Sequence, residues 1–287
     1  AWRNGLFRKG VWRLILEKYQ GCGNDLLIAD GSRPPVFDPQ QVAALCDRHR
    51  GFGADGLIIA RRDPLSMELW NQDGTRAGMC GNGLRCFVHH AYRKGWIQAD
   101  RSYRIGTGDG LRSVWICSTE PFICRVEAGI PDFDAKRMTN QPLLPGLLHA
   151  PFLSQQQSCS FWLGVPHTVL FTTDPEVVSA EQARAIGRHP FFKEGTNVDF
   201  ARLKENGELQ VRTWERGVGW TLACGTGACA SAVAAAIFGL CPLPCKVRCP
   251  GGLLAVEQAP DKKCLLNGPS VYLRTAEVKA SGCKQRN

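Results

Sequence analysis

Two stretches of the chain, "MCGNGLRC" at residues 79–86 and "ACGTGACA" at residues 223–230, carry the same Cys-Gly-x-Gly motif. Each motif follows an alternating apolar run that predicts a β-strand and precedes a run that predicts a helix. A tryptophan lies ten residues before the first cysteine of each motif. Because the Trp, Cys and Gly positions match at one offset of 144 residues, the sequence indicates a duplicated domain.

The two predicted helices end in the same way, since the first closes on Lys94-Gly95 and the second closes near Gly239. Most other segments are short and strand-like, and residues 160–171, "SFWLGVPHTVLF", form one such segment. Two further helices are expected, in "DPQQVAALCDRH" with Asp38 as its N-cap and in "DPEVVSAEQARAIGRHP". The pattern predicts a mixed α/β (α+β) fold.

A proline- and leucine-rich connector at residues 130–151 marks the predicted domain boundary. We expect a first domain at residues 1–130 and a second at residues 131–269.

Composition excludes several classes of protein. No apolar run reaches the length of about 18 residues that a membrane helix needs. The net charge of +9 is carried by scattered residues rather than by a basic stripe, which argues against a nucleic-acid partner. The 14 cysteines include several inside apolar runs, and no signal peptide precedes them, so we expect free thiols in a reducing compartment, the cytoplasm. The basic start, "AWRNGLFRKGVWR", leaves open a targeting remnant and a plastid location.

Two motifs with familiar spacing do not predict a cofactor or a metal. "GFGADG" at residues 51–56 fits the dinucleotide fingerprint, but here a helix precedes the glycines and a strand follows them, which is the reverse of that fold. "CPLPCKVRC" at residues 241–249 lacks the C-x-x-C pairs of metal ribbons, and its last part alternates like a strand. We therefore expect neither a metal nor a cofactor.

Cys80 and Cys224 stand at predicted helix N-termini, where unpaired backbone N–H groups favour a thiolate and bind carboxylates. Two such sites facing each other would hold one carboxylate and place a sulfur on each side of the adjacent carbon. One thiolate could then remove the α-proton while the opposite thiol returns a proton to the other face. The alternative is two buried cysteines whose glycines serve packing.

Six stretches resemble diaminopimelate epimerase in order and spacing: "YQGCGNDLLIAD", "RHRGFGADGLI", "LWNQDGTRAGMCGNGLRCF", "GTNVDFARL", "WERGVGWTLACGTGACA" and "CPGG". The resemblance spans about residue 14 to residue 272 and is similar in detail to cyanobacterial or plant members. It implies two pseudo-symmetric domains, each a mixed sheet wrapped around a central helix, with the active site in the interdomain cleft. It also implies that the C-terminal segment, residues 270–287, returns to the first domain.

The resemblance further implies an isomerase that epimerises LL-2,6-diaminopimelate to the meso form for lysine and peptidoglycan synthesis, without a cofactor. It assigns catalytic roles to Cys80, Cys224, His167 and Glu215. It assigns substrate binding to the following residues: Asn24, Asn71, Gly81, Asn82, Asn197, Glu215, Arg216, Gly225 and Thr226.

Among the departures from the family pattern, one concerns a substrate contact, because the family's Asn-Pro-His motif begins here with Val165. A substrate-binding amide is thereby missing, which questions the identity of the substrate but not the chemistry. The alternatives are a related racemase with another amino-acid substrate, a non-catalytic homologue that binds an amino acid, and a thiol redox protein. The expected partner is a small amino acid, and a homodimer is left open.

Overall fold

The computed structural model describes residues 12–30, 37–141 and 147–280. The basic segment considered as a targeting remnant lies mostly outside this range, and so does part of the predicted connector. The helices and strands follow in this order: β1 (Trp12–Gly21), β2 (Asn24–Ala29), α1 (Pro39–Cys46), β3 (Gly56–Arg61), β4 (Ser66–Asn71), β5 (Arg76–Ala77), α2 (Gly81–Arg93), β6 (Ser102–Thr107), β7 (Gly110–Thr119), β8 (Phe122–Gly129), η1 (Ala135–Arg137), η2 (Pro151–Leu153), β9 (Ser158–Leu163), β10 (Val165–Phe171), η3 (Pro175–Val177), α3 (Ala180–Gly187), β11 (Asn197–Leu203), β12 (Leu209–Glu215), β13 (Gly219–Trp220), α4 (Gly225–Ile237), β14 (Cys245–Cys249), β15 (Gly252–Gln258), β16 (Cys264–Pro269) and β17 (Val271–Ala280).

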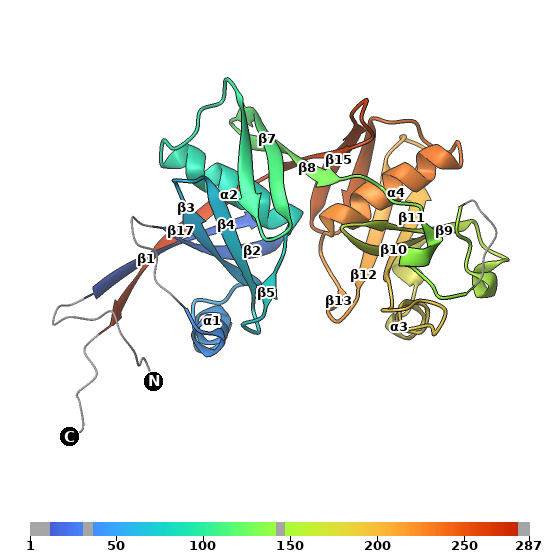
Figure 1. The fold of residues 1–287 in the computed structure, drawn as a ribbon, viewed down its shortest axis with the longest axis horizontal. Helices are drawn as coiled ribbons and strands as arrows, with labels where there is room; N and C mark the ends of the chain where they lie inside the picture. The colour runs from blue at the N-terminus through green and yellow to red at the C-terminus, as the bar shows by residue number, and fades with distance from the viewer. Residues whose placement is uncertain (1–11, 31–36, 142–146, 281–287) are drawn as a thin grey trace.

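The chain forms two lobes, each with one long helix enclosed by strands (Figure 1). Helix α2 packs on β1, β2, β8 and β17, and helix α4 packs on β10, β11 and β12. The strands of both lobes belong to one hydrogen-bonded sheet, and each lobe's part of it is mixed, since β2 pairs with β3 and β10 pairs with β11 in parallel while most other ladders are antiparallel. The predicted α/β class with a helix at the centre of each half is confirmed.

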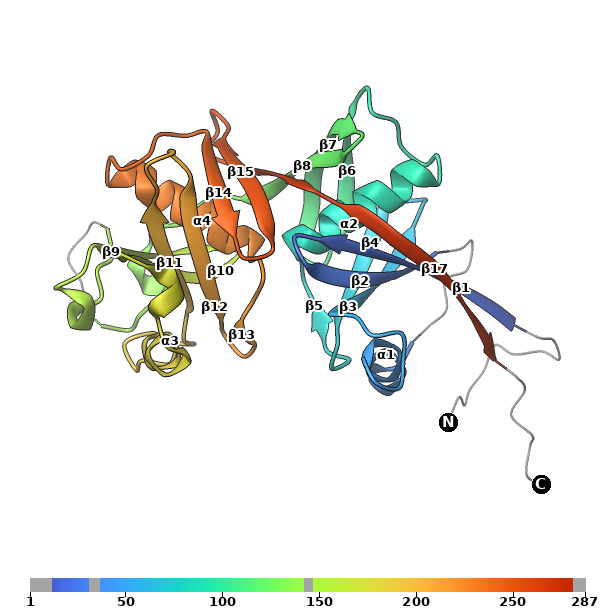
Figure 2. The ribbon, with the colours of Figure 1, turned by 180° about the vertical axis from the view of Figure 1, so that it is seen from behind.

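Two ladders connect the lobes. Strand β16 pairs with β15 on one side and with β8 on the other, so hydrogen bonds run across the junction. Strand β17 then crosses back and pairs with β1 over almost its whole length, as Figure 2 shows from behind. The last described strand thus lies against the first.

The central helices are buried because their sequences are apolar where they meet the sheets. Helix α4, "GTGACASAVAAAI", is buried on nearly all sides, as expected of a helix whose small apolar residues continue around its circumference. One continuous apolar core contains the buried faces of both α2 and α4. Gly95 and Gly239 follow the two helices with φ of 69° each, which confirms the predicted glycine stops.

Helix α1 confirms the predicted N-cap. The Asp38 side chain accepts a hydrogen bond from the Gln41 N–H, and the Gln41 side chain accepts one from the Asp38 N–H. This reciprocal pair is a capping box.

The segment at residues 160–171 is not the single strand that its apolar pattern predicts. Gly164 adopts a φ of 74°, a left-handed conformation that turns the chain tightly. The segment therefore divides into β9 and β10, which pair antiparallel with Val165 opposite Leu163. The turn places His167 inside the second lobe.

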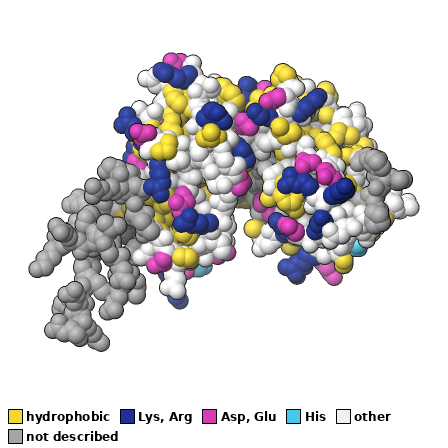
Figure 3. Space-filling model, viewed as in Figure 1, with side chains coloured by type: hydrophobic (Ala, Val, Ile, Leu, Met, Phe, Trp, Pro, Cys, Tyr) yellow, Lys and Arg dark blue, Asp and Glu magenta, His cyan; other side chains and the backbone are white. Residues whose placement is uncertain are grey.

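Lysines, arginines and acidic residues are interspersed on the face shown in Figure 3, and a notch separates the two lobes. Among the described residues, no helix combines the length and apolar character needed to cross a membrane.

Candidate active site

The N-termini of helices α2 and α4 meet at the junction of the lobes. A Cβ atom added to Gly225 would lie 3.6 Å from Gly81 Cα and 3.0 Å from Leu266 Cδ2. The two glycine backbones therefore lie within van der Waals reach of each other, and the Leu266 methyl is the group that a side chain at Gly225 would crowd. The structure therefore brings the two Cys-Gly motifs of the sequence together.

Cys80 and Cys224 are the N-cap residues of the two helices. The Cys224 Sγ accepts a hydrogen bond from the Gly227 N–H at 3.3 Å and lies 3.5 Å from Thr226 Oγ1. Cys80 is partly exposed, whereas Cys224 is buried. Each thiol thus lies beside the unpaired N–H groups of its helix.

The pKa values of the two thiols differ from the expectation that a helix N-terminus lowers them. Burial raises the pKa of Cys80, and the Gly83 N–H group opposes that effect. Burial raises the pKa of Cys224 further, and the Glu215 carboxylate adds to the increase. In this structure, the loss of water around each sulfur has a larger effect on its pKa than the helix N-terminus has.

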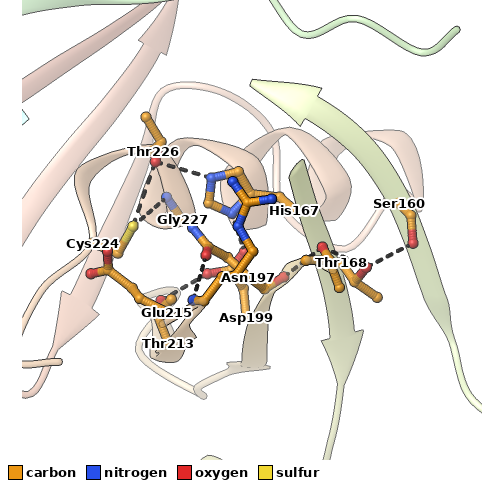
Figure 4. A network of polar contacts seen from close by, with 12 residues as sticks. Ser160, His167, Thr168, Asn197, Asp199, Thr213, Glu215, Cys224, Thr226 and Gly227 are labelled. Atoms are coloured by element: carbon orange, nitrogen blue, oxygen red, sulfur yellow. Dashed lines mark hydrogen bonds and ion pairs between the residues drawn. The ribbon is translucent and has the colours of Figure 1, made fainter. Parts of the chain in front are cut away.

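A chain of polar side chains supports the second helix entrance (Figure 4). Asp199 Oδ2 lies 2.7 Å from His167 Nδ1, and His167 Nε2 lies 3.0 Å from Thr226 Oγ1. Thr213 Oγ1 donates to the other Asp199 oxygen at 2.7 Å. His167 and Asp199 are fully buried, so this chain holds Thr226 in place beside Cys224.

Three other predicted site residues, Glu215, Asn197 and Arg216, lie in the second lobe with Cys224. Glu215 accepts a hydrogen bond from Thr221 Oγ1 at 2.7 Å, and burial raises the pKa of its carboxyl group. Asn197 Oδ1 accepts from the Arg216 N–H at 2.8 Å. The Arg216 guanidinium donates to the Glu194 carbonyl at 2.7 Å and lies 3.3 Å from its carboxylate.

The first lobe contributes two amides that converge on one carbonyl. Asn24 Nδ2 and Asn82 Nδ2 donate to Ala223 O at 3.1 and 3.0 Å. Ala223 directly precedes Cys224, so both amides hold the backbone beside the second cysteine. Asn71 differs, because its exposed side chain donates to Thr75 Oγ1 within its own turn.

Sequence reasoning missed Asp199, although a signal for it was present. Asn197 and Asp199 are two residues apart on β11 and therefore share one face of the strand. Because Asn197 is a predicted site residue, Asp199 on the same face was a candidate for the same site. Glu194 and Thr221 lie in connecting segments and offered no such periodicity.

Two surface hollows of about 500 Å³ and about 150 Å³ lie away from the cysteines. The smaller one is lined in part by Arg184, Trp214 and Arg216, so it reaches one predicted substrate contact. Within the described ranges, no group of three or more His, Cys, Asp or Glu side chains is placed to bind a metal ion.

Comparison with known proteins identifies one family. A family model described as diaminopimelate epimerase matches residues 16–133 and 159–273. A diaminopimelate epimerase of Clostridium perfringens is 36% identical over 84% of this chain and 91% of its own length. That of the cyanobacterium Nostoc punctiforme is 35% identical over 91% of this chain and 98% of its own.

Solved structures share the fold at low identity. A phenazine biosynthesis protein of Bacillus anthracis superposes with a TM-score of 0.64 at 14% identity, covering 93% of this chain and 99% of its own. A hydroxyproline epimerase of Agrobacterium vitis, bound to trans-4-hydroxy-L-proline, superposes with a TM-score of 0.61 at 12% identity, covering 93% and 92%. At this identity the likeness concerns the fold alone.

The buried His167–Asp199 pair predicts a stability effect. Asp199→Ala leaves His167 and Thr213 without their acceptor, so we expect a loss of about 3 kcal/mol and a fall in Tm of roughly 6–12 °C. The matched control is Asp261→Ala, which removes an exposed carboxylate paired with Lys263. That change should leave the melting temperature close to that of the wild type, because solvent screens an exposed ion pair. Equal melting temperatures for the two variants would contradict a structural role for the pair.

Proposed function

Since the chain belongs to the diaminopimelate epimerase family, we propose that Cys80 and Cys224 are the two bases of its cofactor-independent reaction. The chain is an isomerase of lysine biosynthesis, and its substrate is an amino acid. The observation that carries the proposal is the meeting of two helix N-termini, each capped by a cysteine, at Gly81 and Gly225.

The proposed reaction converts LL-2,6-diaminopimelate into the meso form. Backbone N–H groups at Gly81-Asn82 and Gly225-Thr226 hold the α-carboxylate, since unpaired N–H groups at helix entrances bind anions. One cysteine thiolate takes the α-proton, which breaks the C–H bond and leaves its electron pair on the substrate. The opposite thiol donates its proton to the other face of that carbon. No net oxidation takes place, and the helix ends stabilise the negative charge of the transition state.

The remaining site residues have proposed roles around this centre. His167 acts through Thr226, which it holds beside Cys224. Glu215 serves the ammonium end of the substrate, and its burial beside Cys224 supports this assignment.

The distal carboxylate has its own proposed contacts. Asn71, Asn197 and Arg216 bind it, and Arg216 leaves Glu194 to do so. Asn24 keeps its proposed substrate contact in addition to its bond to Ala223.

We also propose domain limits at residues 130 and 269, a homodimer and a cytoplasmic location.

A related racemase with another substrate is the second candidate, and Val165 is the observation that favours it. Val165 begins β10, two residues before His167, and its side chain cannot donate or accept a hydrogen bond. Incubation of the protein with candidate amino acids in deuterated water separates the possibilities, because a non-catalytic binder incorporates no α-deuterium.

Both cysteines are required, one for each face of the substrate. We expect Cys80→Ala or Cys224→Ala to abolish epimerisation of diaminopimelate. Cys→Ser should leave only slow exchange, because a hydroxyl is a far weaker base than a thiolate. Since burial raises both pKa values, activity in the wild type should increase with pH up to or beyond the usual thiol range of about 8.5.

The measurement is α-proton exchange from each stereoisomer in deuterated water. Cys86→Ala, which removes a buried thiol from the same helix, is the matched control and should retain activity. Turnover at the wild-type rate in Cys80→Ala would sink the two-base mechanism.

The enzyme is also expected to be redox-sensitive. In the proposed site the two cysteine sulfurs lie on opposite sides of one carbon, so hydrogen peroxide should inactivate the protein by linking Cys80 to Cys224, and dithiothreitol should restore activity. A competing pair exists, because the Cys241 and Cys245 sulfurs lie 3.3 Å apart.

Peptide mapping is therefore carried out in Cys241→Ser as well as in the wild type. The prediction requires that Cys241→Ser is inactivated as readily as the wild type and contains the Cys80–Cys224 link. Inactive protein with only other pairs would contradict it.

Val165 is expected to weaken binding of the distal carboxylate without changing the class of substrate. A carboxylate oxygen left without a hydrogen bond costs roughly 1–3 kcal/mol, whereas Arg216 can pair with the carboxylate through two N–H groups. Diaminopimelate should therefore remain the best substrate, and Val165→Asn should lower its KM by about tenfold or more.

The comparison uses α-deuterium exchange on diaminopimelate, lysine, histidine and glutamate in both proteins. Val165→Thr, which is close in size to the wild type, separates the effect of polarity from that of volume. Faster exchange on lysine or histidine than on diaminopimelate would show that the racemase alternative is correct.

A further inference from the structure

Arg85 is an arginine inside the protein core. It lies on the second turn of α2, and its side chain is fully buried. Isolated buried charges are costly, and a buried arginine is ordinarily paired with a carboxylate. The partners of Arg85 are instead a backbone carbonyl, a thiol and a carboxamide: Pro269 O, Cys22 Sγ and Asn82 Oδ1.

One nitrogen of this guanidinium has no partner. In the described part of the chain, Arg85 Nη1 is buried and makes no hydrogen bond. It lies 3.9 Å from the position that a Cβ on Gly81 would occupy. Gly81 also adjoins Gly225, so the free nitrogen faces the point where the two helix entrances meet.

The chain makes room for this cation with glycines. A Cβ on Gly268 would lie 2.9 Å from Arg85 Nε, and a Cβ on Gly21 would lie 3.2 Å from Nη2. Both contacts are tighter than ordinary carbon–nitrogen packing. The backbone around the guanidinium is therefore shaped to its volume.

The contact with Asn82 fixes how that side chain points. An amide presents its oxygen to a cation and its NH2 group to an acceptor. Because Asn82 Oδ1 accepts from Arg85, its Nδ2 is directed at Ala223 O across the junction, at 3.0 Å. Without the cation, the amide could turn over, and the carbonyl before Cys224 would lose this donor.

The duplicated motif reveals that this support exists in only one copy. At the offset of 144 residues, Asn82 corresponds to Thr226 and Arg85 corresponds to Cys229. Thr226 is held by His167, whereas Asn82 is held by Arg85. The two entrances are therefore supported by different chemistry.

We propose that Arg85 is a positioning residue of the reaction, which aligns the two cysteines through Asn82 and Ala223 and supplies positive charge beside Cys80. The positive charge of Arg85 favours the thiolate form of Cys80, since it opposes the increase in pKa that burial causes. The expected change in kcat rests on the proposed function, whereas the expected change in the labelling of Cys80 with pH does not.

The test replaces Arg85 by Met, which keeps much of the volume without the charge, and by Lys, which keeps the charge without the fork. Peptide-resolved iodoacetamide labelling of Cys80, followed against pH, reports thiolate formation without any turnover. We expect Arg85→Met to move the labelling profile to higher pH, because a nearby cation lowers the pKa of a thiol. Arg85→Lys should keep the profile near that of the wild type.

Kinetics then separates alignment from charge. Neither variant has the guanidinium group that donates to Asn82 Oδ1. We therefore expect kcat to fall by roughly 10–100-fold in each, with a smaller change in KM. The control is Arg125→Met, which removes an arginine paired with Glu257 and should change neither readout. Circular dichroism and melting establish that each variant is folded.

The following results would overturn the proposal or the function on which it rests. A labelling profile and a kcat like those of the wild type in Arg85→Met would overturn the proposal. If Arg85→Met does not fold, Arg85→Lys decides alone, and an unchanged kcat in that variant would overturn the positioning role. A wild type that exchanges no α-proton would refute the proposed function, while the labelling shift would still test the effect of Arg85 on Cys80.

Discussion

The structure depends on the close approach of two helix N-termini. Gly81 and Gly225 meet almost backbone to backbone, and any side chain at Gly225 would press on Leu266. Both helices must be central for their ends to meet, and they can be central only because they are apolar and enclosed by strands. The interlobe ladder of β8 with β16 and the return of β17 to β1 then hold the lobes together. The strands, the two glycines and the return of β17 thus all support the contact between the N-termini of α2 and α4.

Much of this could be predicted from the sequence. The repeated motif at Cys80 and Cys224, the alternating strands and the glycine helix stops carry local physical signals, and they predicted the two central helices. The strand at residues 160–171 was predicted as one unit because apolar periodicity continues through it. Only the left-handed φ of Gly164 divides it, and glycine alone does not reveal which conformation it adopts.

The polar supports of the site were harder to predict. Asp199 pairs with His167 across a parallel ladder between strands distant in sequence, and Arg85 is supported by carbonyl, thiol and amide groups from three segments. Such partners depend on tertiary packing, which no local pattern records. The pKa expectation was wrong for a related reason. The helix-end contribution could be read from the motif, but the burial that outweighs it depends on the tertiary packing around each sulfur.

The same burial makes the two thiols unequal. The Glu215 carboxylate adds to the increase in pKa at both cysteines, whereas Arg85 opposes the increase at Cys80 and Asp199 adds to it at Cys224. Burial and the two carboxylates therefore raise the pKa of Cys224 well above its usual value. An epimerase that works in both directions must nevertheless bind each stereoisomer with the correct sulfur deprotonated. In the proposed complex the ammonium group of the substrate offsets the charge of Glu215, which removes one cause of the raised pKa at both thiols. In that complex, substrate charge, and not only substrate shape, is a condition for forming the thiolate on either face.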